Sequence, residues 1–275
     1  MKASTAIGIG VAFAGLAVGA LMEGASPTAF FNVPALLIVL GGTFGATFAG
    51  TSIEKIKLIP SLYKKAMGGE KPDMGAQLEL LVGFAERARR EGLLALDEEV
   101  AELDDEFTRK GLQLVVDGTD PELVREILEN EIDGMMARHH AAVSPFEKAG
   151  GFAPTMGIIG TVMGLVHVLE NLDAPATLGP AISGAFIATL YGVGSANVVF
   201  LPTANKLKAM SADEIELRSM TLEGILSIQA GDNPRVVADK LLSFIPPAER
   251  AGEAQSAAEV EDLAGAEAEA EFAAA

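Results

Sequence analysis

Four long stretches of this chain contain no Asp, Glu, Lys or Arg, and they limit its possible folds more than any other feature. They cover residues 3–22, 30–53, 149–169 and 174–205. Each is long enough to form the helix of about 20 apolar residues that crosses a bilayer. A backbone in lipid must satisfy its own hydrogen bonds, and within one segment only a helix does so. The sequence therefore predicts an all-α polytopic membrane protein with four transmembrane helices.

The composition agrees with a membrane protein and argues against other classes. Hydrophobic residues make up 49% of the 275 residues, and the mean hydropathy is +0.33. A net charge of −18 argues against nucleic-acid binding, because phosphate backbones require Lys and Arg surfaces. The chain has no cysteine, and its adjacent His139 and His140 point about 100° apart on a helix, with no third ligand evident. We therefore expect neither disulfides nor a metal site.

The basic residues predict the orientation of the four spans. The lysines nearest the spans are Lys2, Lys55, Lys57, Lys64, Lys65, Lys148, Lys206 and Lys208. The two short connections contain only acidic charges, namely Glu23, Glu170 and Asp173. Lys and Arg mark the cytoplasmic side, so both termini and both large charged blocks are predicted to be cytoplasmic. The alternative of a cleaved signal peptide is disfavoured by the long first apolar run.

This orientation divides the chain into five segments. Residues 1–53 hold transmembrane helices 1 and 2, and residues 149–205 hold helices 3 and 4. Residues 54–148 form a helical cytoplasmic domain, and residues 206–248 form a further helical cytoplasmic segment. Residues 249–275 are rich in Ala and Glu with few large apolar groups, which predicts a disordered acidic tail.

Three helices are expected within residues 54–148. Residues 77–90 place apolar side chains at helical spacing, and a second amphipathic helix is expected to begin in residues 93–107. For the third helix, Gly118 provides a turn, Asp120 a candidate N-cap and Pro121 the first helical position. We expect this helix to continue through Phe146 toward the third span.

Small residues recur every three or four positions in three of the spans. The stripes are Gly42, Ala46, Ala49 and Gly50; Gly157, Gly160 and Gly164; and Ala185, Thr189, Gly192 and Ala196. In lipid such faces let helix backbones approach closely. They predict either packing inside one subunit or packing between subunits.

Four further residues are candidates for an ion path and its coupling. Thr161 and Thr189 can point at a helix interface, although each could instead bond the carbonyl four residues earlier in its own helix. Pro154 and Pro202, near the cytoplasmic ends of spans three and four, permit either a static bend or a hinge. An ion path normally needs an ionisable group in the bilayer, and the four stretches contain no carboxylate. Either the chain conducts nothing, or a partner brings the carboxylate.

Several longer motifs resemble the flagellar motor stator A subunits of the MotA/PomA/MotP family, within the MotA/TolQ/ExbB proton channel superfamily. They are "ARREGLLALDEE" at 88–99, "GGFAPTMGIIGTVMGLVHVLENL" at 150–172, "ISGAFIATLYGVGSANVVFLPTANKLK" at 182–208 and "GDNPRVVADKLLSFIPP" at 231–247. The order of four spans with a large cytoplasmic insertion between the second and the third also resembles that family. The resemblance covers residues 1 to about 248.

The resemblance implies a role and partners. It implies a homopentamer in the bacterial inner membrane, around a B-type subunit (MotB, PomB or MotS-like) whose membrane aspartate binds the permeating ion. It also implies contact with the rotor protein FliG through charged residues, which match Arg89, Arg90, Asp97 and Glu98. Asp97 departs from the family's commoner glutamate. Thr161 favours sodium over protons as the transported ion, since its position is often alanine in proton-type stators.

Two alternatives remain open. A TolQ/ExbB-like energiser would drive a periplasmic process, but that class resembles three-span proteins with an outside N-terminus. A passive scaffold would bind a partner without conducting. No nucleophile–base pair or phosphate-binding glycine loop is evident, so we expect neither an enzyme with catalytic residues nor a cofactor.

Overall fold

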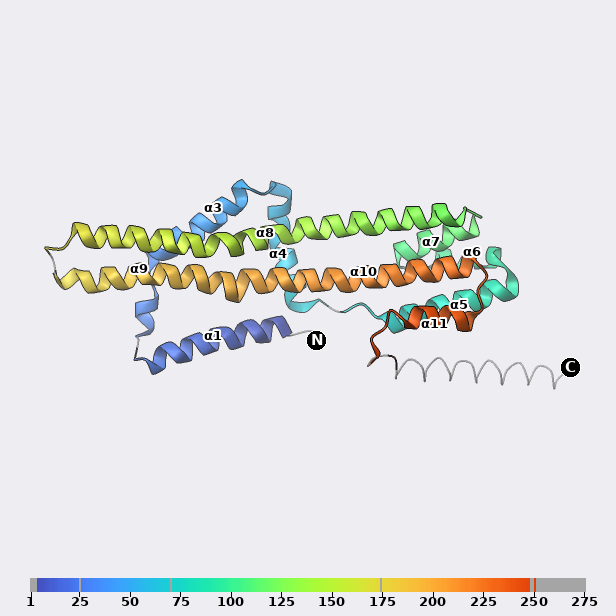
Figure 1. Ribbon diagram of the computed structural model, residues 1–275, viewed down its shortest axis with the longest axis horizontal. Helices are drawn as coiled ribbons and strands as arrows, with labels where there is room; N and C mark the ends of the chain where they lie inside the picture. The colour runs from blue at the N-terminus through green and yellow to red at the C-terminus, as the bar shows by residue number, and fades with distance from the viewer. Residues whose placement is uncertain (1–3, 25, 70, 174, 248–249, 251–275) are drawn as a thin grey trace. The chain divides into compact units, whose positions relative to one another are not determined.

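The structure is a computed structural model, and it describes residues 4–24, 26–69, 71–173, 175–247 and 250. All regular elements in these ranges are helices, which confirms the all-α prediction. The chain forms two compact units. The first, called the membrane unit, comprises Met1–Lys71 and Ala137–Ser211, and the second unit comprises Pro72–Met136 and Ala212–Ala275. Figure 1 shows the elements along the chain.

Four helical stretches are long and apolar enough to cross a bilayer: Thr5–Met22, Pro27–Ala49, and parts of Pro121–Glu170 and Pro175–Gln229. The first stretch lies in α1, Ser4–Met22. Most of its large apolar side chains are exposed, as expected for a helix that faces lipid. The predicted four-span architecture is confirmed.

The second span is less regular than predicted and ends before residue 53. It consists of η1 (Pro27–Phe30), α2 (Val33–Leu36), the π-helical η2 (Leu37–Gly41) and α3 (Gly42–Ala49). The break before α2 has a local cause, because the Asn32 side chain accepts a hydrogen bond from Ala35 N at 3.0 Å and so caps a new helix. Gly50 ends α3, and α4 (Ile53–Gly68) starts after Ser52.

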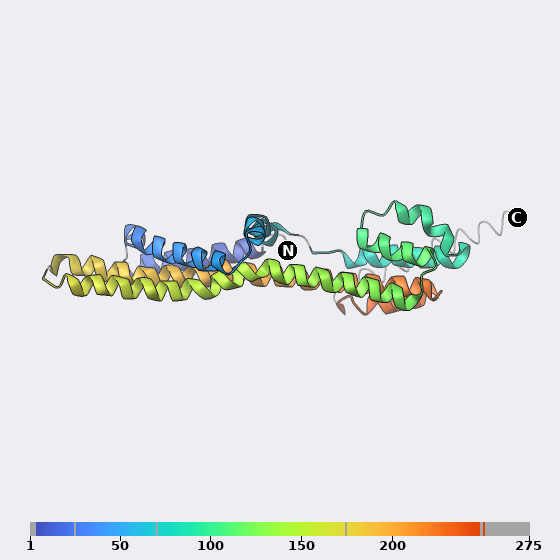
Figure 2. The same cartoon turned by 90° about the horizontal axis from the view of Figure 1, so that it is seen from above.

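The third and fourth spans lie in longer helices. The third is part of α8, Pro121–Glu170. The fourth consists of α9 (Pro175–Ser195), the π-helical η4 (Ala196–Phe200) and the start of α10 (Leu201–Gln229). Within the membrane unit, α8 and α9 run side by side in both views (Figure 1 and Figure 2).

Small residues bring α8 and α9 together. A Cβ added at Gly160 would lie 2.7 Å from the Ala188 Cβ, and one at Gly164 would lie 2.7 Å from the Ala185 Cβ. At Gly192, the added Cβ would collide with the Ala153 carbonyl oxygen. The stripes predicted on spans three and four therefore pack against each other inside one chain, which is the first of the two alternatives.

The membrane unit also contains α4, which lies outside the four apolar stretches. One face of α4 carries Ala66 into a small core with Val143 and Phe146 of α8 and with Ala204 and Leu207 of α10. The Lys208 ammonium also pairs with the Glu147 carboxylate. The apolar cluster attaches α4 to the two long helices, and the ion pair joins those two helices to each other.

The start of α8 follows the prediction closely. Gly118 has φ +75°, a backbone conformation that glycine adopts readily. The Asp120 side chain accepts a hydrogen bond from Glu122 N at 2.9 Å, and Pro121 is the first residue of the helix. The helix continues through Phe146 into the third span, as predicted.

The second unit contains α5 (Met74–Glu91), η3 (Leu93–Leu96), α6 (Asp97–Ala101), α7 (Glu106–Val116) and α11 (Pro234–Leu242), with parts of α8 and α10. Its core includes Leu81, Leu96, Leu112, Leu128 and Ile225, all fully buried. The helix predicted over 77–90 is confirmed as α5.

The second amphipathic helix, expected to begin in residues 93–107, is not one continuous element. The chain forms η3 and α6, breaks, and starts α7 at Glu106. The break has a local cause, because the Asp105 side chain caps α7 by accepting from Thr108 N at 2.9 Å. The division into five segments stays a prediction, and the predicted tail lies outside the described residues except for Arg250.

Candidate functional site

The two threonines singled out in the sequence meet across the contact between α8 and α9. Thr161 Oγ1 lies 2.5 Å from Thr189 Oγ1. It also lies 2.8 Å from the Ala185 carbonyl oxygen, to which it can donate a hydrogen bond. Its own i−4 carbonyl, that of Gly157, lies 3.1 Å away. The geometry therefore includes the bond within one helix that was the alternative for Thr161, and adds two contacts to α9.

Proton counting shows what this cluster can do. A threonine hydroxyl has one proton and two lone pairs, so Thr161 can donate fully to only one of its three neighbours. Ala185 is four residues before Thr189, and its carbonyl is the acceptor that Thr189 would use within α9. The cluster therefore offers several oxygens at one level of the helix pair, and it has no ionisable group. It can ligate a cation in part, but it cannot carry a proton.

Gly157 makes this cluster possible. A Cβ added at Gly157 would lie 3.0 Å from the Ala188 carbonyl oxygen and 3.2 Å from the Thr189 Cα. Those distances leave little room for a side chain, so the two backbones meet at the level of the threonines. The small-residue stripe and the hydroxyl pair are one feature of the structure.

Pro154 does not interrupt α8, which is helical on both sides of it. Since proline has no N–H, the Gly150 carbonyl four residues earlier loses its helical donor. The Gly150 turn packs on the fourth span, where an added Cβ would lie 2.8 Å from the Leu201 Cγ and 3.7 Å from the Phe200 Cβ. Leu201 directly precedes Pro202. The turn whose carbonyl lost its donor at Pro154 therefore packs on the residue next to the second proline.

Pro202 follows the π-helical turn η4, in which Leu201 N bonds the Ala196 carbonyl. A π-turn accommodates the ring, which would otherwise crowd the Val198 carbonyl. The buried Thr203 hydroxyl donates to the Val199 carbonyl at 2.7 Å and satisfies one group of the altered turn. Neither proline is at a sharp break, and whether they act as hinges stays a prediction.

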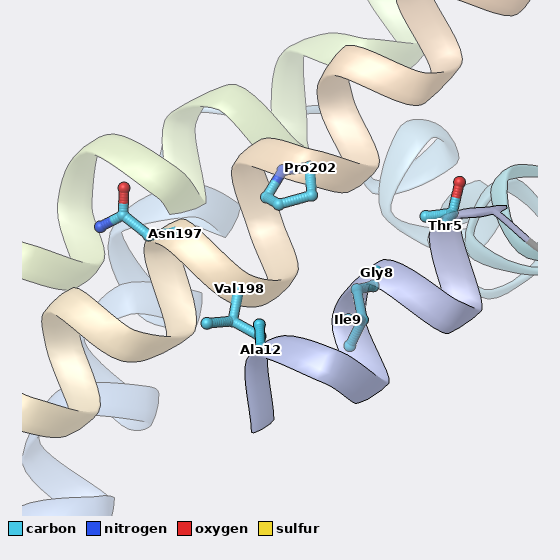
Figure 3. A pocket seen from close by; sticks show the side chains of 7 residues that line it. All are labelled: Thr5, Gly8, Ile9, Ala12, Asn197, Val198 and Pro202. Carbon is cyan, nitrogen blue, oxygen red and sulfur yellow. The ribbon is translucent and has the colours of Figure 1, made fainter. Parts of the chain in front are cut away.

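A groove lies beside this turn. It has a volume of about 300 Å³ and is lined by Thr5, Gly8, Ile9, Ala12, Asn197, Val198 and Pro202. Figure 3 shows α1 on one side of the groove and the π-helical turn with Pro202 on the other. The Asn197 side-chain amide donates a hydrogen bond within its own helix, to the Val193 carbonyl at 2.9 Å. Space beside Pro202 is thus available for a change in the turn.

The four charged candidates lie in the second unit and are all exposed. Arg89 and Arg90 are in the last turn of α5, while Asp97 and Glu98 begin α6. Arg90 pairs only weakly with Glu86, at 3.5 Å between Nη2 and Oε2. Asp97 accepts from Gln113 Nε2 at 3.1 Å. These contacts are surface contacts of small energy, so the side chains are available to a partner.

The neighbouring Arg87 is held differently. Its guanidinium bonds Glu99 at 2.6 Å and Glu91 at 3.4 Å, and these carboxylates raise the pKa of Arg87 above its ordinary value. The pair with Glu99 connects α5 to α6. Arg87 therefore connects the two short helices that carry the charged candidates.

Comparison with known proteins identifies the family. A model of the MotA/TolQ/ExbB proton channel family matches residues 99–220. Motility protein A of Bacillus subtilis (strain 168) is 38% identical over 270 residues, which are 96% of this chain and all of the relative. Motility protein A of Helicobacter pylori (strain 26695) is 37% identical over 90% of this chain and 97% of the relative.

The chain belongs to the motility protein A family. The solved flagellar MotAB stator complex from Bacillus subtilis contains a chain with a TM-score of 0.85 and 38% identity, covering 90% of this chain and 98% of that one. A chain of the C. jejuni MotAB structure has a TM-score of 0.85 and 31% identity, over 90% of this chain and 97% of that one. The resemblance stated from the motifs is confirmed.

Membership of the motility protein A family narrows the alternatives. The family model spans both stator and TolQ/ExbB proteins, but the full-length relatives are motility proteins. Their family consists of ion-channel and stator subunits and not of enzymes, as predicted. Like its relatives, the chain is a multi-pass membrane protein.

The sequence analysis missed Tyr191, whose hydroxyl connects the second span to the fourth. The Tyr191 hydroxyl donates to the Phe30 carbonyl and accepts from Asn32 N at 3.2 Å. Tyr191 is one of only two tyrosines in the chain, and a lone tyrosine within an apolar span usually has a partner for its hydroxyl. The sequence therefore indicated that the Tyr191 hydroxyl has a partner, but it did not identify Phe30 and Asn32 as the residues that supply it.

Proposed function

We propose that the chain is the ion-conducting stator subunit of a bacterial flagellar motor. The observation that carries this proposal is the Thr161–Thr189 pair, which supplies oxygens but no ionisable group between two spans without carboxylates. The relative from Bacillus subtilis was solved in a flagellar MotAB stator complex. By analogy, a MotB-type subunit supplies the membrane aspartate, and the two proteins together form the path.

Sodium is our preferred transported ion over the proton. A dehydrated sodium ion needs several oxygens at once, because loss of hydration without replacement is costly. The Thr189 hydroxyl and the Ala185 carbonyl both lie within hydrogen-bond distance of Thr161 Oγ1, so three oxygens are close together. A partner carboxylate and water would complete the coordination. No resident cofactor is needed for this role.

The functional complex is proposed to be a homopentamer around the B-type subunit, in the inner membrane with both termini cytoplasmic. The small-residue stripes of spans three and four no longer support this, because they pack inside one chain. Exposed apolar side chains on both spans do leave surface for further copies. Examples are Ile158, Ile159, Val162, Met163, Phe186 and Val193. Native mass spectrometry of the solubilised complex should show five copies, and a monomer would contradict the assembly.

Torque is proposed to pass to the rotor protein FliG through Arg89, Arg90, Asp97 and Glu98. Pro154 and Pro202 are proposed to couple ion passage to the cytoplasmic helices. The packing of the Gly150 turn on Leu201 supports a shared response of the two prolines.

The decisive experiment measures sodium and proton uptake in cells that express the chain with and without its B-type subunit. We expect uptake only with both proteins, and loss of uptake when the B-subunit aspartate is changed to asparagine. Uptake that needs no partner would contradict the carboxylate proposal, and no uptake in any combination would favour a scaffold. A reporter fused to the N-terminus tests the TolQ/ExbB-like energiser, which predicts an outside location.

A further inference from the structure

One apolar side chain of the second unit stands out by its exposure. Leu94 is 78% exposed, whereas the next most exposed large apolar side chains of that unit's described part, Leu123, Met136 and Val236, are 45–47% exposed. Single exposed apolar residues are common on protein surfaces. Leu94 differs because of how its backbone is held and because charged residues flank it in sequence.

The turn that carries Leu94 is fixed from both sides. Leu96 is fully buried in the core of the second unit and Leu93 packs against that core. Gly92, at φ +86°, donates its N–H to the Ala88 carbonyl at 2.9 Å and accepts from Ala95 N at 3.2 Å. Two neighbours therefore point inward while Leu94 is held outward in η3. A pre-ordered apolar side chain loses little conformational entropy when a partner covers it.

Charged residues flank Leu94 on both sides in sequence. The exposed Arg89 and Arg90 end the helix before η3, and the exposed Asp97 and Glu98 begin the helix after it. A fully covered apolar centre with a polar, partly solvated rim is the usual anatomy of a protein–protein contact. A bilayer surface fits less well, because anionic lipid would be repelled by the acidic start of α6.

We infer that Leu94 is the apolar anchor of the rotor-binding surface and inserts into an apolar pocket on the rotor protein. The charged residues around it then set orientation and approach rate, while Leu94 supplies salt-independent affinity. The partner surface must present an apolar pocket between one acidic and one basic group. This inference rests on the proposed function, and it adds a residue of a different chemical kind to that surface.

The test measures binding of the purified stator complex to purified FliG at low and high salt. Leu94→Ala should weaken binding about tenfold, because a leucine side chain loses most of its apolar burial. The apolar contribution to affinity is not screened by salt, so the loss of FliG affinity in Leu94→Ala should persist at high salt. The loss of affinity in Arg89→Glu should shrink there, because salt screens charge interactions. Leu94→Met should bind nearly as well as the wild type.

Leu123→Ala is the matched control, because Leu123 is another exposed leucine of the same unit. It should bind FliG like the wild type. All variants should keep the unfolding temperature and native mass of the parent complex, since Leu94 lies outside the core. These measurements separate a binding defect from a folding defect.

Each other outcome has a defined meaning. If Arg89→Glu weakens binding but Leu94→Ala does not, the anchor role is overturned while the rotor contact stands. If the wild-type complex does not bind FliG at all, the proposed rotor contact fails and the anchor fails with it. If Leu94→Ala changes the number of copies in the complex but leaves FliG binding intact, the side chain faces another copy of the chain, which also overturns the inference.

Discussion

Thr161 Oγ1 lies 2.5 Å from Thr189 Oγ1, at a level where Gly157 lets α8 and α9 meet backbone to backbone. The two hydroxyls are therefore neighbours on a partly buried contact between spans, and each loses a partner if the other is removed. This relationship makes the two residues testable as a pair.

Thr161→Ala should reduce sodium-driven rotation and leave or reveal proton-driven rotation, because it removes one oxygen ligand. Thr161→Ser keeps the oxygen and should be mild, while Thr189→Ala should impair rotation with either ion. Swimming speed across a series of sodium concentrations measures the effect. If the wild type swims equally well without sodium and Thr161→Ala changes nothing, the sodium assignment is wrong.

Gly192→Ala should destabilise the solubilised protein by about 1–3 kcal/mol, because a Cβ there meets the Ala153 carbonyl of the facing helix. Gly194→Ala is the control, since nothing lies within 4 Å of a Cβ added at Gly194. Both changes alter helix propensity alike, so the difference isolates the contact. Denaturant titrations in detergent measure it, and equal stabilities would show that the helices separate freely.

Pro202→Ala should lower swimming speed more than ion uptake, because a restored N–H can bond the Val198 carbonyl and replace the π-turn by regular helix. Pro180→Ala, at an exposed position inside α9, should leave both quantities near the wild-type values. The comparison needs swimming speed and ion uptake from the same cells. Wild-type speed for Pro202→Ala would remove the proline from the coupling role.

Arg89→Glu should weaken motility and leave ion uptake nearly intact, because Arg89 is exposed in the second unit, outside the transmembrane segments. Arg125→Glu is the control, since Arg125 is also partly exposed and has one weak pair, with Glu129 at 3.7 Å. It should swim normally. A collapse of uptake in Arg89→Glu would assign this residue to folding or gating.

The Asp105–Arg218 pair should make the second unit sensitive to acid. Burial raises the pKa of Asp105, but hydrogen bonds from Arg218 and Thr108 outweigh it and hold the pKa below its ordinary value of 3.8. The stabilisation is therefore present above about pH 4 and is lost as the pH falls through the lowered pKa.

Asp105→Asn tests that contribution while keeping the helix cap, because asparagine also caps. It should cost about 1 kcal/mol near pH 7, a modest value because the carboxylate is partly exposed. Unfolding of the full chain between about pH 3 and pH 7 should show the two proteins converging in acid. A difference that stays constant with pH would assign the effect to packing alone.

The sequence by itself determined the elements whose cause is local. An uncharged stretch of about 20 residues must be helical in lipid, so the four spans followed from composition. Gly118, Asp120 and Pro121 carry their own turn, cap and first helical position, so the start of α8 was predictable to the residue. The absence of a carboxylate from the four uncharged stretches also followed from the sequence, which left open whether the chain conducts nothing or a partner brings the carboxylate.

Tertiary structure decided which side chains meet. The sequence could not choose whether Thr161 bonds its own helix or its neighbour, because that depends on how closely two backbones approach, and Gly157 and Ala188 set this distance from separate helices. The break between α6 and α7 has a local cap, Asp105 on Thr108 N, but the same carboxylate is also bonded by Arg218, a contact that the helical pattern of residues 93–107 does not reveal. Likewise, only the burial of Leu96 and the packing of the partly buried Leu93 against the core turned Leu94 outward. Helical periodicity is a local signal, whereas these contacts join residues that only the folded chain brings within a few ångströms.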